Sequence, residues 1–182
     1  AGASNTLDAG NMVDGEDILS WADQSGNNNH GIDMSGASQR PHWETDAADF
    51  GGLLFDGSND GMALTSDVVI SANEDFTVMI RVKITSFAST AKAVWGNSAH
   101  DVLKMPTGGK KINILIGGSG ASAFEEASDT LATDEYYIIT LTRSNGSDGD
   151  LEVRVHGDTY SDKSWDAAES HQDADSLDIG YI

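Results

Sequence analysis

The sequence predicts an all-β protein, an antiparallel β-sandwich of the jelly-roll type. The first observation is the segment 75–85, in which every even-numbered residue is apolar and every odd-numbered residue except Met79 is polar or charged. Alternation over this length is typical of a strand with one buried and one exposed face. We expect it to be the central strand of a sheet. The second observation is that short apolar segments recur between Gly, Asn and Asp turns, as in sandwiches and jelly rolls.

Further strands are expected wherever an apolar or alternating segment lies between such turns. These segments are 17–22, 40–43, 53–55, 62–64, 93–95, 102–105, 111–117, 136–143, 151–156 and 176–182. Segments 53–55 and 62–64 are expected to pair as a hairpin, and 145–150 is expected to be the turn of another. The sequence favours no helix beyond one turn near Asp46 or Trp165.

Composition excludes several classes of protein. A chain of 182 residues is expected to form one domain over 1–182, without linker or repeat. It carries 30 acidic residues against 10 basic ones, a net charge of −20, so nucleic acid and anionic membranes are not expected as partners. The absence of Cys excludes disulfides and thiolate chemistry. No apolar run approaches the ~20 residues of a membrane span, and no signal peptide is recognised.

Two polar loops, 23–31 and 56–61, each have two interpretations. Both are rich in Asn, Asp and Gly, which tolerate positive φ and bond to nearby backbone, so we favour structural turns. Asn-rich loops also bind metals or sugars. The second loop has calcium-type residues in Asp56, Asn59 and Asp60, but it lacks the alternating acids and closing Glu of an EF-hand.

The order of six segments resembles the laminin-G-like, concanavalin A-type jelly rolls, in particular the modules of phage and virus structural proteins and of bacterial surface proteins. The segments are Ser-Trp-Ala-Asp-Gln-Ser-Gly-Asn-Asn-Asn-His-Gly at 20–31, Leu-Phe-Asp-Gly-Ser-Asn-Asp at 54–60, Asp-Phe-Thr-Val-Met-Ile-Arg-Val-Lys at 75–83, Tyr-Tyr-Ile-Ile-Thr-Leu-Thr-Arg at 136–143, Val-Arg-Val-His-Gly at 153–157 and Leu-Asp-Ile-Gly at 177–180. The resemblance covers roughly residues 7–182.

The chain departs from this family at two places. Ile80 or Arg81 stands where the family commonly has an aromatic residue. The family also continues past its Ile-Gly segment with a final strand, which this sequence does not include. The resemblance therefore implies either that the protein continues beyond Ile182 or that another chain supplies the strand, since an unpaired edge invites a neighbour.

Enzymatic chemistry has little support in the sequence. Retaining glycosidases need two carboxylates about 5.5 Å apart, and the Glu-x-Asp-x-Glu pattern of jelly-roll glucanases is not found here. Glu125 and Glu126 are adjacent, so they would point to opposite faces of a strand. The His residues show no metal-ligand spacing. We therefore expect a non-enzymatic protein, with glycoside hydrolysis as the least favoured hypothesis.

Candidate binding residues come from loops and aromatics. The resemblance implies that Asn97 and Asp101 lie near a position that supplies calcium ligands in some relatives, although an acidic loop in an acidic protein is the alternative. Trp95, Tyr160 and Trp165 are candidates for contacting a sugar, because exposed aromatic rings stack on sugars. The alternative for each Trp is a place in the core.

These observations predict a binding or assembly module. We expect a structural protein of a virion or cell surface, such as a decoration, tail or filament component, whose partners are other subunits in a homo- or hetero-oligomer. We expect an extracellular or virion-surface location. The alternative is a lectin-like adhesion module that binds glycans, assisted by calcium.

Overall fold

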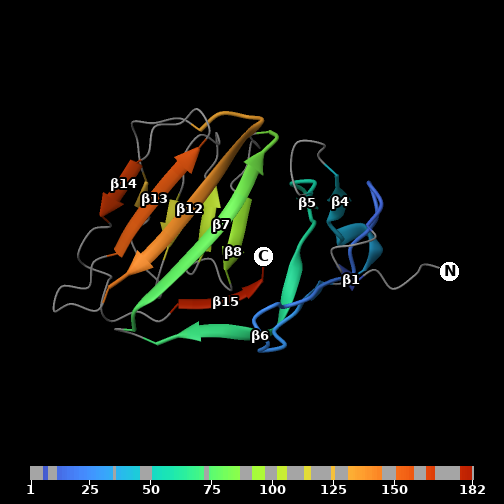
Figure 1. Ribbon diagram of the computed structural model, residues 1–182, viewed down its shortest axis with the longest axis horizontal. Coiled ribbons are helices and arrows are strands. Elements are labelled where there is room, and N and C mark those ends of the chain that lie inside the picture. The colour runs from blue at the N-terminus through green and yellow to red at the C-terminus, as the bar shows by residue number, and fades with distance from the viewer. Residues whose placement is uncertain are drawn as a thin grey trace. The chain divides into compact units, whose positions relative to one another are not determined.

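The computed structural model is built almost entirely of β-strands (Figure 1). It describes residues 6–7, 12–34, 36–45, 51–71, 74–86, 92–96, 102–105, 113–115, 124–125, 131–144, 151–157, 163–166 and 177–181. The chain divides into two compact units, which we call the first unit (Ala1–Asp67 with Ile179–Ile182) and the second unit (Val68–Asp178). The expectation of one domain over 1–182 stays a prediction.

The described residues of the first unit form short strands and one 3₁₀ turn. They are β1 (Thr6–Leu7), β2 (Ser20–Trp21), β3 (Gly31–Asp33), η1 (Ala37–Gln39), β4 (His42–Glu44), β5 (Gly52–Leu54) and the start of β6 (Met62–Ile70). β1 runs parallel to β2, and the pairs β2–β3, β3–β6 and β4–β5 are antiparallel. Ile18 and Met62 are fully buried here.

The predicted hairpin from 53–55 to 62–64 is wrong. β5 pairs with β4, and β6 pairs with β3. The loop between them explains the difference. The Asp56 carboxylate accepts hydrogen bonds from the backbone N–H groups of Ser58 (2.7 Å) and Asn59 (3.2 Å), while Asn59 Nδ2 donates to the carbonyl of Ser38 (2.8 Å). The turn is therefore held against η1 instead of closing a hairpin.

The second unit contains the longer strands. They are β7 (Phe76–Ile84), β8 (Lys92–Gly96), β9 (Val102–Met105), β10 (Asn113–Leu115), β11 (Phe124–Glu125), β12 (Glu135–Arg143), β13 (Leu151–Gly157), β14 (Lys163–Asp166) and the start of β15 (Leu177–Tyr181). One sheet has the order β14–β13–β12–β7 and is antiparallel throughout. Strands β8, β9, β10 and β11 pair in that order, also antiparallel.

The alternation predicted for the long strand is confirmed, but its central position is wrong. All even-numbered residues of β7 are buried or half-buried, and its odd-numbered ones are exposed except for Lys83. In the described part of the sheet, β7 is an edge strand and β12 lies between β7 and β13. Charged side chains such as Arg81 and Lys83 suit an edge strand, because they discourage pairing with another chain.

The core of the second unit follows from the same period-two pattern. Among its described residues, the buried apolar ones are Ile84, Trp95, Leu131, Tyr137, Ile139, Leu141, Val153 and Val155. The last five come from β12 and β13, whose predicted hairpin is confirmed by their pairing. Burying one such apolar side chain contributes about 1.5–3 kcal/mol to the free energy of unfolding, so each of these residues stabilises the unit.

The polar segment around Trp165 forms strand β14, not the turn of helix that we considered there, and η1 was not expected. The other candidate turn, near Asp46, lies outside the described residues. Across the described residues, no helix is long and apolar enough to span a membrane. The all-β, antiparallel class is confirmed, with β1–β2 as a parallel exception.

Candidate binding face

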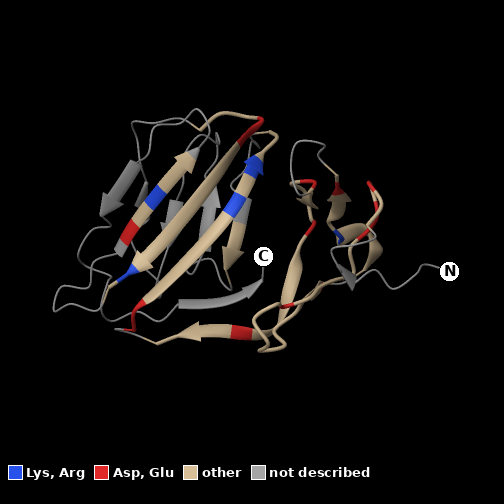
Figure 2. Ribbon diagram, viewed as in Figure 1, with Lys and Arg blue, Asp and Glu red and all other residues tan. Residues whose placement is uncertain are grey.

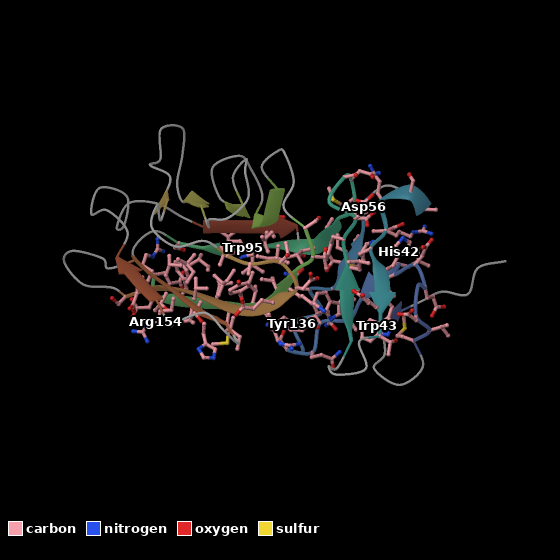
Figure 3. The ribbon with its side chains drawn as sticks, turned by 90° about the horizontal axis from the view of Figure 1, so that it is seen from above. His42, Trp43, Asp56, Trp95, Tyr136 and Arg154 are labelled. Carbon is pink, nitrogen blue, oxygen red and sulfur yellow. The ribbon has the colours of Figure 1, made fainter. Side chains whose placement is uncertain are left out.

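The candidate site is the solvent side of the sheet β7–β12–β13, which we call the outer face. Side chains alternate along each strand, so the residues between the buried ones point to this side. They are Thr77, Met79, Arg81, Lys83, Tyr136, Ile138, Thr140, Thr142, Glu152, Arg154 and His156, all exposed or half-buried. Figure 3 shows Arg154 and Tyr136 along the side of this sheet that faces away from Trp95.

Strand register places Arg and His residues around an apolar centre. Ile138 lies opposite Arg81 on one side and His156 on the other. Thr140 lies between Met79 and Arg154 in the next row of the same face. Directly opposite residues in an antiparallel pair lie about 4.5–5.5 Å apart at Cβ, so these side chains form one continuous patch.

Tyr136 organises the cationic end of the outer face. The Arg81 guanidinium carbon lies 3.8 Å from the centroid of the Tyr136 ring, and Lys83 Nζ lies 5.3 Å from it. A cation over an aromatic ring at an exposed site is worth about 0.5–1 kcal/mol. A stacked guanidinium has lost part of its rotamer freedom already, so ordering it against a ligand costs less.

The charge of the outer face is opposite in sign to that of the whole chain. It carries Arg81, Lys83 and Arg154 against one acidic residue, Glu152, whereas the chain has 30 acidic residues against 10 Lys and Arg. Arg154 Nη2 lies 2.8 Å from Glu152 Oε2. Figure 2 shows the basic residues as blue bands on β7 and β13. The face is therefore a local cationic surface on a polyanionic protein.

Apolar side chains are exposed between these charges. Met79 is 64% exposed and Ile138 is 37% exposed. Tyr, Met and Arg are enriched at protein interfaces, whereas Lys, Glu and Asp are depleted there. Tyr136, Met79 and the two Arg residues of the outer face belong to the enriched types, whereas Lys83 and Glu152 on the same face belong to the depleted ones.

Of the residues proposed from sequence as binding sites, the structure describes only Trp95 and the backbone of Trp165. Trp95, on β8, is 3% exposed, and its Nε1 has no hydrogen-bond partner among the described residues. Trp165 lies on β14 opposite Val153, and only its backbone is described. Tyr160, Asn97 and Asp101 lie outside the described residues. Their roles in sugar or calcium binding stay predictions.

Sequence reasoning did not identify the outer face. The sequence did contain a pattern that indicates this face. Arg81 and Lys83 occupy polar positions of one predicted strand, and Tyr136 occupies a position of another predicted strand that alternates with its apolar residues. What could not be read from sequence was which strands pair. The register Tyr136↔Lys83 and Ile138↔Arg81 is what places the cations beside the aromatic ring.

Both polar loops form hydrogen-bonded turns, but the second does not close the hairpin that the sequence predicted. In the first loop, Asp23 Oδ1 accepts from Ser25 N (2.7 Å), and Asp23 Oδ2 accepts from Ser25 Oγ (2.8 Å) and Asn29 N (3.0 Å). The hydrogen bonds from Ser25 and Asn29 lower the pKa of Asp23 from 3.8 to about 2. Among the residues whose side chains are described, no cluster of three or more His, Asp or Glu residues could hold a metal ion.

Comparisons of the chain with protein-family models, with curated proteins and with solved structures found no match.

Proposed function

We propose that this chain is a non-enzymatic binding or assembly module that serves as a structural protein of a virion or cell surface. The observation that carries the proposal is the outer face, where cationic, aromatic and exposed apolar side chains share one side of a regular sheet. Such a face offers contact area and fixed charge to a partner. It extends the binding hypothesis from loops and single aromatics to the sheet β7–β12–β13.

The finer fold is part of the proposal. We propose that the second unit is a β-sandwich of the laminin-G-like jelly-roll type. Two features support this. The first is the order of the three segments 75–83, 136–143 and 153–157, which lie within the second unit. The second is the view in Figure 3, where the sheet containing β12 and β13 forms one layer and Trp95 of β8 lies on the side of that sheet opposite Tyr136 and Arg154. Sandwiches of this class leave one face of each sheet available for partners.

A second candidate function is glycan binding, in which the outer face holds a carboxylated or sulfated sugar. Tyr136 favours it, because its ring sits beside cationic groups that would pair with such a sugar. The predicted calcium assistance at Asn97 and Asp101 and the predicted aromatic contacts at Trp95, Tyr160 and Trp165 belong to this hypothesis. We place glycoside hydrolysis last, because the sequence lacks the paired-carboxylate pattern.

The experiment uses the intact chain in three parallel assays at pH 7. Light scattering with and without calcium measures the oligomeric mass, a panel of neutral and acidic polysaccharides measures binding, and release of reducing sugar measures hydrolysis. Assembly or retention of a polysaccharide, without release of reducing sugar, supports the proposal. Catalytic release of reducing sugar would overturn it. Assembly or thermal stabilisation that requires calcium would direct attention to Asn97 and Asp101.

The same assays separate the two candidate functions when they are repeated with Tyr136→Ala. Loss of polysaccharide retention with unchanged oligomeric mass favours glycan binding by the outer face. Thr142→Ala is the matched control, because it truncates a side chain three rows from Tyr136 that lies opposite Thr77 and not opposite Arg81 or Lys83.

A further inference from the structure

We propose that the outer face docks onto the acidic first unit of a second copy of this chain, so that copies join head to tail. This inference rests on the proposed binding and assembly function and names its partner. It uses two different surfaces of the same chain, which makes the contact heterologous. A heterologous contact closes into a ring or continues as a filament, whereas a two-fold contact stops at a dimer.

Charge complementarity identifies the partner. Residues 1–67 contain twelve acidic residues and a single basic one, Arg40, which is itself paired with Asp33 at 2.9 Å. Among the described residues of that unit, the exposed acidic ones are Asp14, Glu44, Asp56 and Asp67. Figure 2 shows the described acidic residues of this unit as red bands with little blue among them. The outer face carries the opposite charge, so its contact with this unit is electrostatically favourable.

The exposed apolar residues favour a protein as the occupant over a polysaccharide. Met79 and Ile138 gain free energy when a partner covers them, about 25 cal/mol for each Å² of apolar surface removed from water. A highly charged polysaccharide has little apolar surface to cover them with. An acidic protein surface supplies both carboxylates and apolar contact area, and the first unit has such residues in its exposed Val13 and Met34.

The size of the outer face sets the strength of the contact. Strands lie about 4.8 Å apart and rise about 3.3 Å per residue, so three strands of about seven residues present roughly 350 Å². Twice this area is below the 1,200–2,000 Å² of stable interfaces. We therefore expect weak association of each pair of copies, of the kind that filaments and rings strengthen by repetition.

The net charge of each copy opposes the contact at long range. With −20 on each copy, repulsion acts over a screening length of about 30 Å at 0.01 M salt but only about 8 Å at 0.15 M and about 3 Å at 1 M. Pairs of opposite charges in close contact between the outer face and the acidic unit are weakened little by moderate salt and strongly by high salt. Association is therefore expected to be greatest at intermediate ionic strength.

The test is sedimentation velocity on the intact chain and two variants, at protein concentrations up to about 1 mM, where weak contacts are populated. The face variant is Arg81→Ser with Arg154→Ser, and the acid variant is Glu44→Lys with Asp67→Lys. Each is expected to weaken self-association roughly tenfold, because charged pairs at a desolvated contact carry much of its free energy. Circular dichroism confirms that each variant is folded.

Two further variants separate the contact from general charge effects. Gln24→Glu with Asn27→Asp makes the chain more negative by the same amount as the face variant, but it leaves the outer face intact. It should associate at least as well as the unmodified chain. Arg81→Lys with Arg154→Lys keeps the charge of the face and should restore most of the association, which also covers the case in which the Ser variant fails to fold.

Mixing gives the decisive measurement. The face variant keeps its acidic unit and the acid variant keeps its outer face, so an equimolar mixture should form a one-to-one dimer and stop there. The proposal is overturned if the unmodified chain is monomeric at every salt concentration, if the face variant associates normally, or if the mixture gives no dimer. Retention of an acidic polysaccharide by a strictly monomeric chain would overturn this inference and leave the proposed function standing. Hydrolysis of a polysaccharide would overturn the proposed function whatever the association.

Discussion

Gly51 shows how one residue can determine local packing. Its backbone has φ of +74°, and an added Cβ would clash with the indole ring of Trp43 on the neighbouring strand. We expect Gly51→Ala to destabilise the protein by about 2–4 kcal/mol, because it combines a left-handed backbone, costing about 1–2 kcal/mol, with overpacking. Urea unfolding followed by tryptophan fluorescence measures this.

Two neighbouring glycines supply controls for that substitution. Gly57 also has positive φ, +70°, but a Cβ there would meet no atom within 4 Å, so Gly57→Ala reports the backbone cost alone. A Cβ on Gly52 meets no atom either, and Gly52 lies in strand β5, so Gly52→Ala should be close to neutral. Equal effects of Gly51→Ala and Gly57→Ala would contradict the role assigned to Trp43.

Asp23 makes the stability of its loop depend on pH. Hydrogen bonds from Ser25 and Asn29 stabilise the carboxylate, which lowers its pKa from 3.8 to about 2 in the folded protein. Because the folded-state pKa is lower, the contribution is fully present above about pH 4 and is lost as the pH falls from there toward 2. Asp23→Asn should therefore lower the unfolding temperature at pH 7 and have a shrinking effect below pH 4.

Thermal melts of Asp23→Asn and Asp67→Asn at matched pH test this expectation. Asp67→Asn removes the same charge at an exposed position of the first unit, so it corrects for the change in net charge. If the difference between the two variants were constant from pH 7 to pH 2, the carboxylate would not act through its hydrogen bonds.

At the scale of elements, period-two alternation was sufficient to predict the strongest strands. β7, β12 and β13 lie where the sequence placed them, and β12 and β13 pair antiparallel as predicted. The turn predicted at 145–150 lies outside the described residues. Pairing was predicted poorly where it depends on a specific loop contact, such as Asn59 on the carbonyl of Ser38. β14 has little apolar character, and its backbone pairing with β13 is a tertiary effect that composition does not reveal.

The candidate site was not predicted for the same reason. Each outer-face residue is an ordinary polar position of a strand when considered alone. Arg81 and Tyr136 are more than fifty residues apart in sequence, and only the β7–β12 register brings them within 3.8 Å. The loops and aromatic residues proposed from the sequence were chosen for their residue type. Residue type does not tell which side chains become neighbours when strands pair.

Arg143 joins the end of β12 to the turn that precedes β7. It is 2% exposed, and its guanidinium donates from Nε to the carbonyl of Glu74 (2.9 Å) and from Nη2 to that of Ser71. The same group lies 5.0 Å from the Phe76 ring centroid. We expect Arg143→Met to lower the free energy of unfolding by about 2–4 kcal/mol, because hydrogen bonds to a charged group contribute about 1.5–3 kcal/mol each.

Arg154→Met is the matched control on the adjacent strand. Arg154 is exposed, and its pair with Glu152 is a surface salt bridge, which contributes little to stability. Urea unfolding of both variants distinguishes a buried anchoring Arg from a surface one. Comparable losses from the two substitutions would show that the contacts of Arg143 with the turn are not what stabilises it.

At the scale of the whole molecule, charge is distributed unevenly along the chain. The first 67 residues contain twelve acidic residues and one basic residue, while the outer face of the second unit is cationic. The same charges act in two ways. Close opposite charges on different copies favour association, whereas the like charges within one copy oppose compactness. Dilution separates the two effects, because only the first depends on protein concentration.

The intramolecular effect gives the last prediction. Raising sodium chloride from about 0.01 M to about 0.15 M shortens the screening length from about 30 Å to about 8 Å, which reduces repulsion among the 30 acidic residues. The unfolding temperature of the dilute chain should therefore rise with salt at pH 7. Glu44→Lys with Asp67→Lys removes part of that repulsion beforehand, so this variant should begin at a higher unfolding temperature in low salt and respond less to added salt.

The contrary outcome is an unfolding temperature of the unmodified chain that stays constant or falls as salt is added. Attractive charge pairs would then outweigh repulsion in the folded protein. Local pairs such as Arg40 with Asp33 would stabilise the first unit more than its excess of negative charge destabilises it.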